Sequence, residues 1–200
     1  MAPGSRMDQS TNNVTVNSGF VFVILDQYRG MERVCAPIFE MTRELDRNAP
    51  RKPIPIALYN EVCGWIEENL GAASVREVGR AVGGQIVAYM QKTKPIPHPM
   101  PHDVLEELTR AAQVGVQDQR GRGWEMKDAI EGRIVMRRTQ TFNCIMQEGL
   151  LLALVEHCGV LMPRVDHRAC TRHGAEFCDY EVRWLVKRSS RTIAAVGRSA

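Results

Sequence analysis

The sequence has 200 residues and a mass of 22.5 kDa, which is enough for one domain and too short for a large multidomain enzyme. Hydrophobic residues make up 44% and charged residues 24%, the composition of a globular protein rather than a disordered or fibrous one. The apolar runs at residues 20–25 and 150–155 are far too short to cross a bilayer, so we expect no membrane span. Because no export signal opens the sequence, we expect a cytoplasmic protein whose six cysteines are thiols or metal ligands rather than disulfides.

The net charge of +3 is unevenly distributed. Residues 187–200 carry four basic side chains and no acidic one, whereas residues 1–18 sum to zero, so residues 19–186 carry a net charge of −1. A nucleic-acid-binding domain usually has a basic face, so we expect no nucleic-acid partner. The polar, aperiodic residues 1–18 predict a disordered leader, and residues 187–200 predict a basic flexible tail. Between them, residues 19–186 form the single predicted domain.

The first half of the domain has helical patterns. After the short apolar run at residues 20–25, apolar spacing predicts a helix over residues 31–39, although Pro37 falls inside it. A second helix is predicted over residues 58–70, ending at Gly71, and a third over residues 74–90, where Ser74 and Glu77 form a capping-box motif. A proline-rich connector at residues 95–101 leads into a fourth helix over residues 103–116.

The second half alternates strand and helix patterns. Strands are predicted at residues 124–127 and 133–138, a helix at residues 142–158, and two further strands at residues 160–167 and 177–186. The last strand has apolar residues at every second position, as expected for a strand with one buried face. The order of helices followed by a β-β-α-β-β unit predicts an α+β fold, with an antiparallel sheet and helices packed on one side.

Two cysteines near the end of the domain are the main candidates for chemistry. Cys170 and Cys178 flank a turn around Gly174, so they are predicted to face each other across a hairpin, with Cβ atoms about 4.5–5.5 Å apart. That separation suits a shared tetrahedral metal ion and a disulfide equally well. His167 lies three residues before Cys170, and a regular strand would place it on the opposite face unless the strand bends.

A fourth metal ligand must come from another element. Cys144 and Cys158 lie at the two ends of the predicted helix, about 21 Å apart, so both cannot bind one ion, and spacing alone does not choose between them. The simpler alternative is a set of buried thiols and a surface histidine. Arg133, Arg137 and Arg138 are interpreted as charges that guard an exposed strand edge, or else as an anchor for an acidic ligand.

Several motifs point to known families. They are Gln147-Glu-Gly-Leu-Leu-Leu-Ala-Leu-Val-Glu156 followed by Gly159, then Cys170-x7-Cys178 and Tyr180-x-Val-x-Trp184. Residues 124–184 thereby resemble the 4-vinyl-reductase domain family, whose fold is shared with nitric-oxide-signalling and Golgi-transport ligand-binding domains. Three further segments resemble a bacterial family of haem- or nitric-oxide-binding-like proteins: Leu58-Tyr-Asn-Glu-Val-Cys-Gly-Trp-Ile-Glu-Glu-Asn-Leu-Gly71, Gly123-Trp-Glu125 and Met136-Arg-Arg-Thr-Gln-Thr-Phe-Asn143.

The resemblance implies a set of zinc ligands. In 4-vinyl-reductase-type sensors of aromatic effectors, one helix cysteine and a carboxylate-x2-Cys-x7-Cys stretch hold a zinc ion. Carried over to this sequence, the cysteine ligands are Cys144, Cys170 and Cys178, and His167 stands where the carboxylate would be. Histidine and cysteine are both common zinc ligands. Because four protein ligands leave no coordination position open, the implied zinc is structural.

The function expected from this resemblance is a non-catalytic small-molecule-sensing or regulatory domain. The ligand would be small and mostly apolar, and the family implies a homodimer. The candidate lining residues, each of which could also be ordinary core, are Trp65, Tyr89, Trp124, Met136 and Phe142.

Two alternatives to the sensing domain remain open. One is a dimeric adaptor that holds a protein partner without a ligand. The other is a tetrapyrrole biosynthesis enzyme or assembly factor, for which no Ser-His-Asp or paired-carboxylate arrangement is found. Because His98 and His102 lie in the proline-rich connector and no haem attachment motif is present, no haem is expected.

Overall fold

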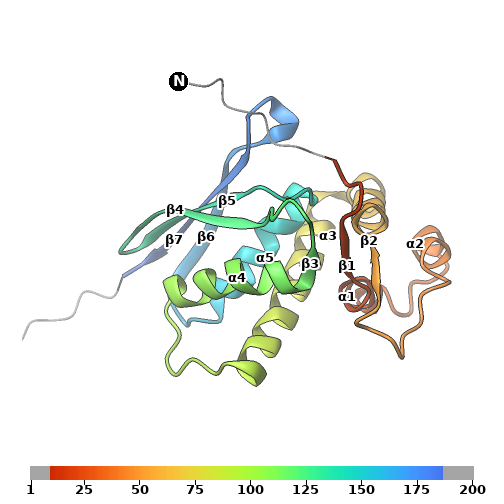
Figure 1. Ribbon diagram of the computed structural model, residues 1–200, viewed down its shortest axis with the longest axis horizontal. Helices are drawn as coiled ribbons and strands as arrows, with labels where there is room; N and C mark the ends of the chain where they lie inside the picture. The colour runs from red at the N-terminus through yellow and green to blue at the C-terminus, as the bar shows by residue number, and fades with distance from the viewer. Residues whose placement is uncertain (1–9, 187–200) are drawn as a thin grey trace, which may run out of the picture.

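The computed structural model describes residues 10–186, and the structural statements below concern this part of the chain. The fold is α+β, as the sequence predicts (Figure 1). In chain order its elements are β1 (Thr15–Asn17), α1 (Gly19–Gln27), α2 (Ala36–Met41), β2 (Pro53–Pro55), α3 (Ile56–Thr93), α4 (Pro101–Gly115), β3 (Val116–Gln117), β4 (Trp124–Ile130), β5 (Arg133–Arg138), α5 (Cys144–Glu156), β6 (Leu161–Ala169), the short 3-10 helix η1 (Thr171–His173) and β7 (Cys178–Leu185). None of these helices combines the length and the hydrophobicity needed to cross a bilayer.

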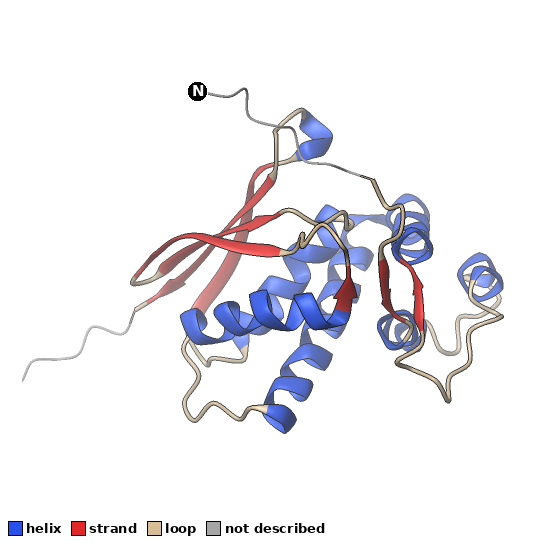
Figure 2. Cartoon of the chain, in the orientation of Figure 1, coloured by secondary structure: helices blue, strands red, loops and turns tan. Residues whose placement is uncertain are grey.

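The larger sheet has the strand order β4-β5-β7-β6, with every neighbouring pair antiparallel. Helix α5 connects β5 to β6, which confirms the predicted β-β-α-β-β unit, and the helices cover one face of the sheet (Figure 2). Alternate residues of β5 and β7 are buried on that face, among them Ile134, Met136 and Val182. Each such side chain contributes about 1.5–3 kcal/mol by its burial, so the alternating pattern fixes which face meets the helices.

Helices α3 and α5 touch through their backbones. A Cβ atom added at Gly79 would lie 1.9 Å from the carbonyl oxygen of Met146, and one added at Gly149 would lie 1.9 Å from the carbonyl oxygen of Arg76. Only glycine allows this approach, because any side chain would overlap the other helix. The close packing fixes where α5 begins relative to α3.

Helix α3 is 38 residues long and bends at Gly71, which has φ 87° and ψ 168°. The sequence predicts that one helix ends at Gly71 and that a second follows it. The non-helical backbone of Gly71 confirms this, because α3 consists of two helical segments separated by a kink, although the second segment begins before the predicted Ser74. The positive φ angle is accessible to glycine and strained for other residues. The predicted capping box is not formed, because the hydroxyl of Ser74 donates to the carbonyl oxygen of Leu70 at 2.9 Å.

A second, small sheet near the start of the described chain was not predicted. It has the order β2-β1-β3, and Val16 and Ile54 are 2% and 4% exposed. The predicted leader is therefore too long, because residues 15–17 form a strand; residues 1–9 lie outside the described part. The apolar run at residues 20–25 lies within α1, and the helix predicted from residue 31 begins only at Ala36, with Pro37 in its first turn. The predicted tail at residues 187–200 also lies outside the described residues.

Candidate metal centre

Four side chains from three elements meet between α5 and the β6–β7 hairpin. Cys144 is the first residue of α5, His167 lies in β6, Cys170 directly follows β6, and Cys178 is the first residue of β7. Their candidate ligand atoms all lie within 4.8 Å of one another. The Sγ atom of Cys144 is 3.6 Å from that of Cys178 and 3.8 Å from that of Cys170. A tetrahedral zinc ion with Zn–S bonds near 2.3 Å separates its sulfur ligands by about 3.8 Å, so the cluster already has suitable dimensions.

A β-bulge places His167 on the same side as the cysteines. His167 is opposite Tyr180, while Ala169 is opposite Asp179, so β6 advances by two residues where β7 advances by one. The extra residue reverses the side on which the following side chains point. The strand bend that the sequence analysis required is therefore this bulge. Gly174, with φ 87°, ends η1 and turns the chain back towards β7.

His167 is held with one nitrogen outward and the other inward. Its Nδ1 atom is 3.5 Å from Oε1 of Glu148, and its ring stacks on Tyr180 with centroids 4.4 Å apart. Its Nε2 atom is buried without a hydrogen-bond partner among the described residues. A carboxylate on one imidazole nitrogen and a free second nitrogen is the usual arrangement of a metal-ligating histidine. Burial lowers the pKa of His167, but the nearby Cys178 and Glu148 outweigh this effect and raise the pKa to about 9.

The environment of Cys144 and Cys178 favours a thiolate. The hydrogen bond between the Cys144 and Cys178 sulfurs holds the pKa of Cys178 well below its usual range, against the opposing effect of burial and with further help from His167 and Arg138. The same hydrogen bond, together with burial, raises the pKa of Cys144 well above its usual range. Cys144 also lies at the amino end of α5, where the helix dipole favours negative charge. The metal-free pair thus shares one proton, which a metal ion would displace.

The amino end of α5 is fixed by its own cap. The side-chain Oδ1 atom of Asn143 accepts hydrogen bonds from the backbone N–H groups of Ile145 and Met146 at 3.0 and 3.1 Å. An Asn cap contributes about 1 kcal/mol to helix stability. It also orients the first turn of α5, and therefore Cys144.

Arg138 lies directly behind the cysteines and was missed as a site residue. Its side chain is buried, with Nη2 3.0 Å from the sulfur of Cys178 and 3.4 Å from the sulfur of Cys144. The interpretation of the three β5 arginines as guards of an exposed edge is wrong, because β5 lies between β4 and β7. Arg137 instead pairs with Asp179 on the other face, and Arg133 pairs with Glu181.

Two residues of α3 hold the surroundings of the cluster. Glu67 accepts hydrogen bonds from Arg172 of η1 at 2.6 and 3.0 Å and from the side-chain amide of Asn143. Arg76 donates to Glu148 at 2.7 Å, and so supports the carboxylate that contacts His167. Glu67, Asn143 and Glu148 lie in segments that carry the family resemblance, but none of them was predicted as a site residue. No periodicity or spacing marks Arg76 and Arg172.

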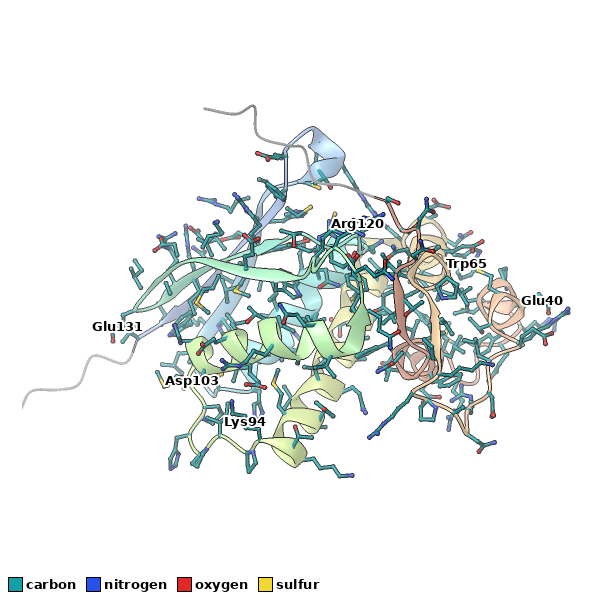
Figure 3. All side chains as sticks on the ribbon, viewed as in Figure 1. Glu40, Trp65, Lys94, Asp103, Arg120 and Glu131 are labelled. Atoms are coloured by element: carbon teal, nitrogen blue, oxygen red, sulfur yellow. The ribbon has the colours of Figure 1, made fainter. Side chains whose placement is uncertain are left out.

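The predicted ligand-lining residues are not gathered around one hollow. Met136 is fully buried, and Tyr89 is 50% exposed. Trp124 packs on Tyr180 and Phe142 on Tyr59, each with ring centroids 5.6 Å apart. Trp65, on α3, lies well away from Glu131 in the β4–β5 turn (Figure 3). Their role in ligand binding stays a prediction.

Comparisons with known proteins place the fold. No protein-family model matches the sequence, and no curated protein matches it. Among solved structures, an H-NOX protein from S. oneidensis in the Fe(II)NO ligation state matches with a TM-score of 0.63 and 12% identity, over 84% of this chain and 99% of that chain. An Fe(II) unliganded H-NOX protein mutant from K. algicida matches with a TM-score of 0.57 and 10% identity, over 86% and 98%. The chain has the H-NOX fold.

A third H-NOX structure contradicts one sequence-based expectation. It was solved to probe haem distortion in the H-NOX family, and it matches with a TM-score of 0.52 and 12% identity, over 84% of this chain and 94% of that chain. The expectation of no haem is therefore wrong, because it relied on the lack of an attachment motif and a noncovalently held haem needs none. The similarity at these identities concerns the H-NOX fold, and the resemblance to 4-vinyl-reductase domains is not confirmed by it.

Two hollows of the described chain differ in volume and lining from what a haem requires. The larger one, of about 620 Å³, lacks any residue type that usually ligates haem iron. It is lined by Asn13, Thr15, Gln113, Val116, Gln117, Asp118, Gln119, Gly121 and Arg122. The smaller one includes His157 but has a volume of only about 20 Å³, and the side chains of His98 and His102 are exposed. Neither hollow combines room for a haem with a residue that could ligate its iron.

Proposed function

We propose that this chain is a non-catalytic small-molecule-sensing or regulatory domain with a structural zinc ion, similar in kind to the 4-vinyl-reductase-type ligand-binding domains. The observation that carries the proposal is the Cys144, His167, Cys170 and Cys178 cluster, which is already assembled at zinc-like spacing. Its donor set of three sulfurs and one imidazole is among the commonest for structural zinc.

The composition of the cluster supports a structural rather than a catalytic ion. Four protein ligands complete a tetrahedron and leave no position for water or substrate. The ion would tie the amino end of α5 to the β6–β7 hairpin. Packing, the Glu148–His167 contact and a hydrogen bond from the Tyr180 hydroxyl to the Cys144 carbonyl oxygen already join these elements. The residues that surround the cluster hold and orient the ligands, and none of them is placed to act on a substrate.

The fold supports the sensing role. The similar H-NOX structures include one described in an Fe(II)NO ligation state, so a small ligand is bound by proteins of this fold. For this chain we propose a small, mostly apolar ligand near Trp65, Tyr89, Trp124, Met136 or Phe142, and a homodimer on the basis of the family resemblance. A protein partner that reads the ligand state would complete the regulatory role.

The decisive experiment is native mass spectrometry of protein purified without added metal or ligand, combined with elemental analysis. We expect one zinc ion per chain and X-ray absorption that shows three sulfur ligands and one nitrogen. Cys170→Ser should weaken zinc binding enough for the ion to be lost during purification. Cys158→Ser should retain the ion, because Cys158 follows the other end of α5 and lies outside the cluster. Metal-free protein, or zinc retained by both variants, would refute the zinc site. An absorption spectrum of the same sample would reveal bound haem, and a retained organic mass would identify the ligand.

A further inference from the structure

Arg138 places a permanent positive charge inside the protein, because a guanidinium group does not lose its proton in proteins. The residue is 2% exposed, and its polar contacts are the sulfurs of Cys144 and Cys178 and the carbonyl oxygen of Phe142. Its Nε atom has no partner. Among residues 10–186, no aspartate or glutamate forms an ion pair with it, so its counter-charge must come from the sulfurs.

The other charges around the cluster are already balanced in pairs. Glu148 is paired with Arg76 at 2.7 Å, and Glu67 with Arg172 at 2.6 Å. On the opposite face of β5, Arg137 is paired with Asp179 at 2.8 Å. A buried charge without a partner is strongly unfavourable. Arg138, which no carboxylate of residues 10–186 balances, therefore constrains the charge of the cluster itself.

The charge of a loaded cluster follows from its donors. A divalent ion contributes +2, three thiolates contribute −3, and a neutral imidazole contributes nothing, which leaves a net charge of −1. This is the charge that Arg138 would neutralise. The hydrogen bonds from its Nη2 atom to two of the three sulfurs place the positive charge where the excess negative charge lies.

We propose that Arg138 is the built-in counter-charge of the metal centre, which makes a buried site of one divalent ion and three thiolates electrically neutral. The inference rests on the proposed zinc site and adds a positioning residue to it. Arg138 acts on the metal only through the sulfurs that it contacts.

The first test compares three variants of the full chain by competition for zinc with a chromophoric chelator. Arg138→Met removes the charge and should weaken zinc binding about tenfold or more, the size of effect usual for residues that contact metal ligands. Arg138→Lys keeps the charge and should stay close to the wild type. Arg137→Met, on the neighbouring residue and the opposite face, should leave zinc affinity unchanged, because its charge is paired with Asp179.

A double-mutant cycle separates charge from packing. Cys170→Ser removes one thiolate from a residue without a direct contact to Arg138, which leaves the loaded site and Arg138 together at +1. Adding Arg138→Met to that variant restores neutrality. We therefore expect the effect of Arg138→Met on zinc affinity to shrink or change sign in the Cys170→Ser background. A purely structural role would give the same loss in both backgrounds.

The outcomes are distinct. Wild-type protein without zinc refutes the proposed function, whereas zinc-binding wild type with an unaffected Arg138→Met variant refutes only the counter-charge. Equal losses in Arg138→Met and Arg138→Lys also overturn it, because they indicate shape rather than charge. If Arg138→Met alone does not fold, rescue of folding by Cys170→Ser in the presence of zinc supports the inference. Failure of that rescue overturns it.

Discussion

Glu148 and His167 form a contact that sets the orientation of the metal site: Oε1 of the carboxylate lies 3.5 Å from Nδ1 of the imidazole. The contact fixes a proton on Nδ1, and it leaves Nε2 as the nitrogen that faces the sulfurs. A carboxylate in this position also increases the basicity of a metal-ligating histidine. Glu148 is itself held by Arg76, so three residues from α3, α5 and β6 act in series.

The first prediction concerns Glu148. Glu148→Gln should weaken zinc binding by about 10–100-fold without removing a ligand, since the amide neither fixes the imidazole proton as firmly nor raises its basicity. Zinc competition titration measures the change. The matched control is Glu156→Gln, on the same helix, whose carboxylate pairs with Arg80 at 2.7 Å away from the cluster. Equal affinities for both variants would show that the Glu148 contact does not support the site.

The second prediction concerns pH in chelator-treated protein. Burial lowers the pKa of His167, but Cys178 and Glu148 raise it from 6.5 to about 9. Because the folded-state pKa lies above the unfolded value, the contribution of His167 to stability is complete below pH 6.5 and is lost as the pH rises towards 9. Zinc competes with the same proton, so zinc affinity should rise over this window. An imidazole titration followed by NMR gives the midpoint, and a value near 6.5 would contradict the prediction.

The third prediction separates metal ligands from buried thiols. Cys178→Ala should lower the free energy of unfolding by several kcal/mol in zinc-containing buffer, because binding to the folded state adds its free energy to stability. Cys63→Ala, also 0% exposed, should cost only about 1–3 kcal/mol through lost packing. Chemical denaturation with and without chelator distinguishes them. Chelator should destabilise the wild type and Cys63→Ala, and should leave Cys178→Ala unchanged.

The fourth prediction tests the contact between α3 and α5. Gly79→Ala should destabilise the protein by about 3 kcal/mol or more, because the new methyl group would overlap the backbone of α5. Gly84→Ala is the control on the same helix. A Cβ atom at Gly84 has no other atom within 4 Å, and alanine is a better helix former than glycine. Gly84→Ala should therefore leave the free energy of unfolding unchanged or raise it by about 0.5–1 kcal/mol. Thermal melts of both variants give the comparison.

The sequence predicted the large sheet and its connecting helix because their apolar periods match the final burial. Met136 of β5 and Val182 of β7 each belong to a pattern in which every second residue is apolar, and both side chains are fully buried. The small sheet was not predicted because its strands are only two or three residues long and one of them, β2, contains Pro53 and Pro55. The break at Gly71 was predicted correctly, because glycine commonly follows the last residue of a helix and readily takes the positive φ angle found there.

The four candidate ligands came from cysteine spacing and a family resemblance, and the structure brings them together. What the sequence could not supply was the bulge that turns His167 towards the cysteines, because register shifts depend on how β6 pairs with β7. Arg138 was missed for a similar reason. On a strand, neighbouring residues face opposite sides, and only the tertiary structure reveals that Arg138 is enclosed while Arg137 is paired outside.

The bend at Gly71 lies between the two residues through which α3 contacts the surroundings of the cluster. Glu67, before the bend, is tied to Arg172, and Arg76, after it, is tied to Glu148. A change in the bend angle would therefore alter the geometry around these two ion pairs. If a ligand favours a different angle, thermodynamic reciprocity requires that the ligand weaken metal binding by the same factor by which the metal weakens ligand binding. The shape of the longest helix and the affinity for the metal thus form a single coupled equilibrium.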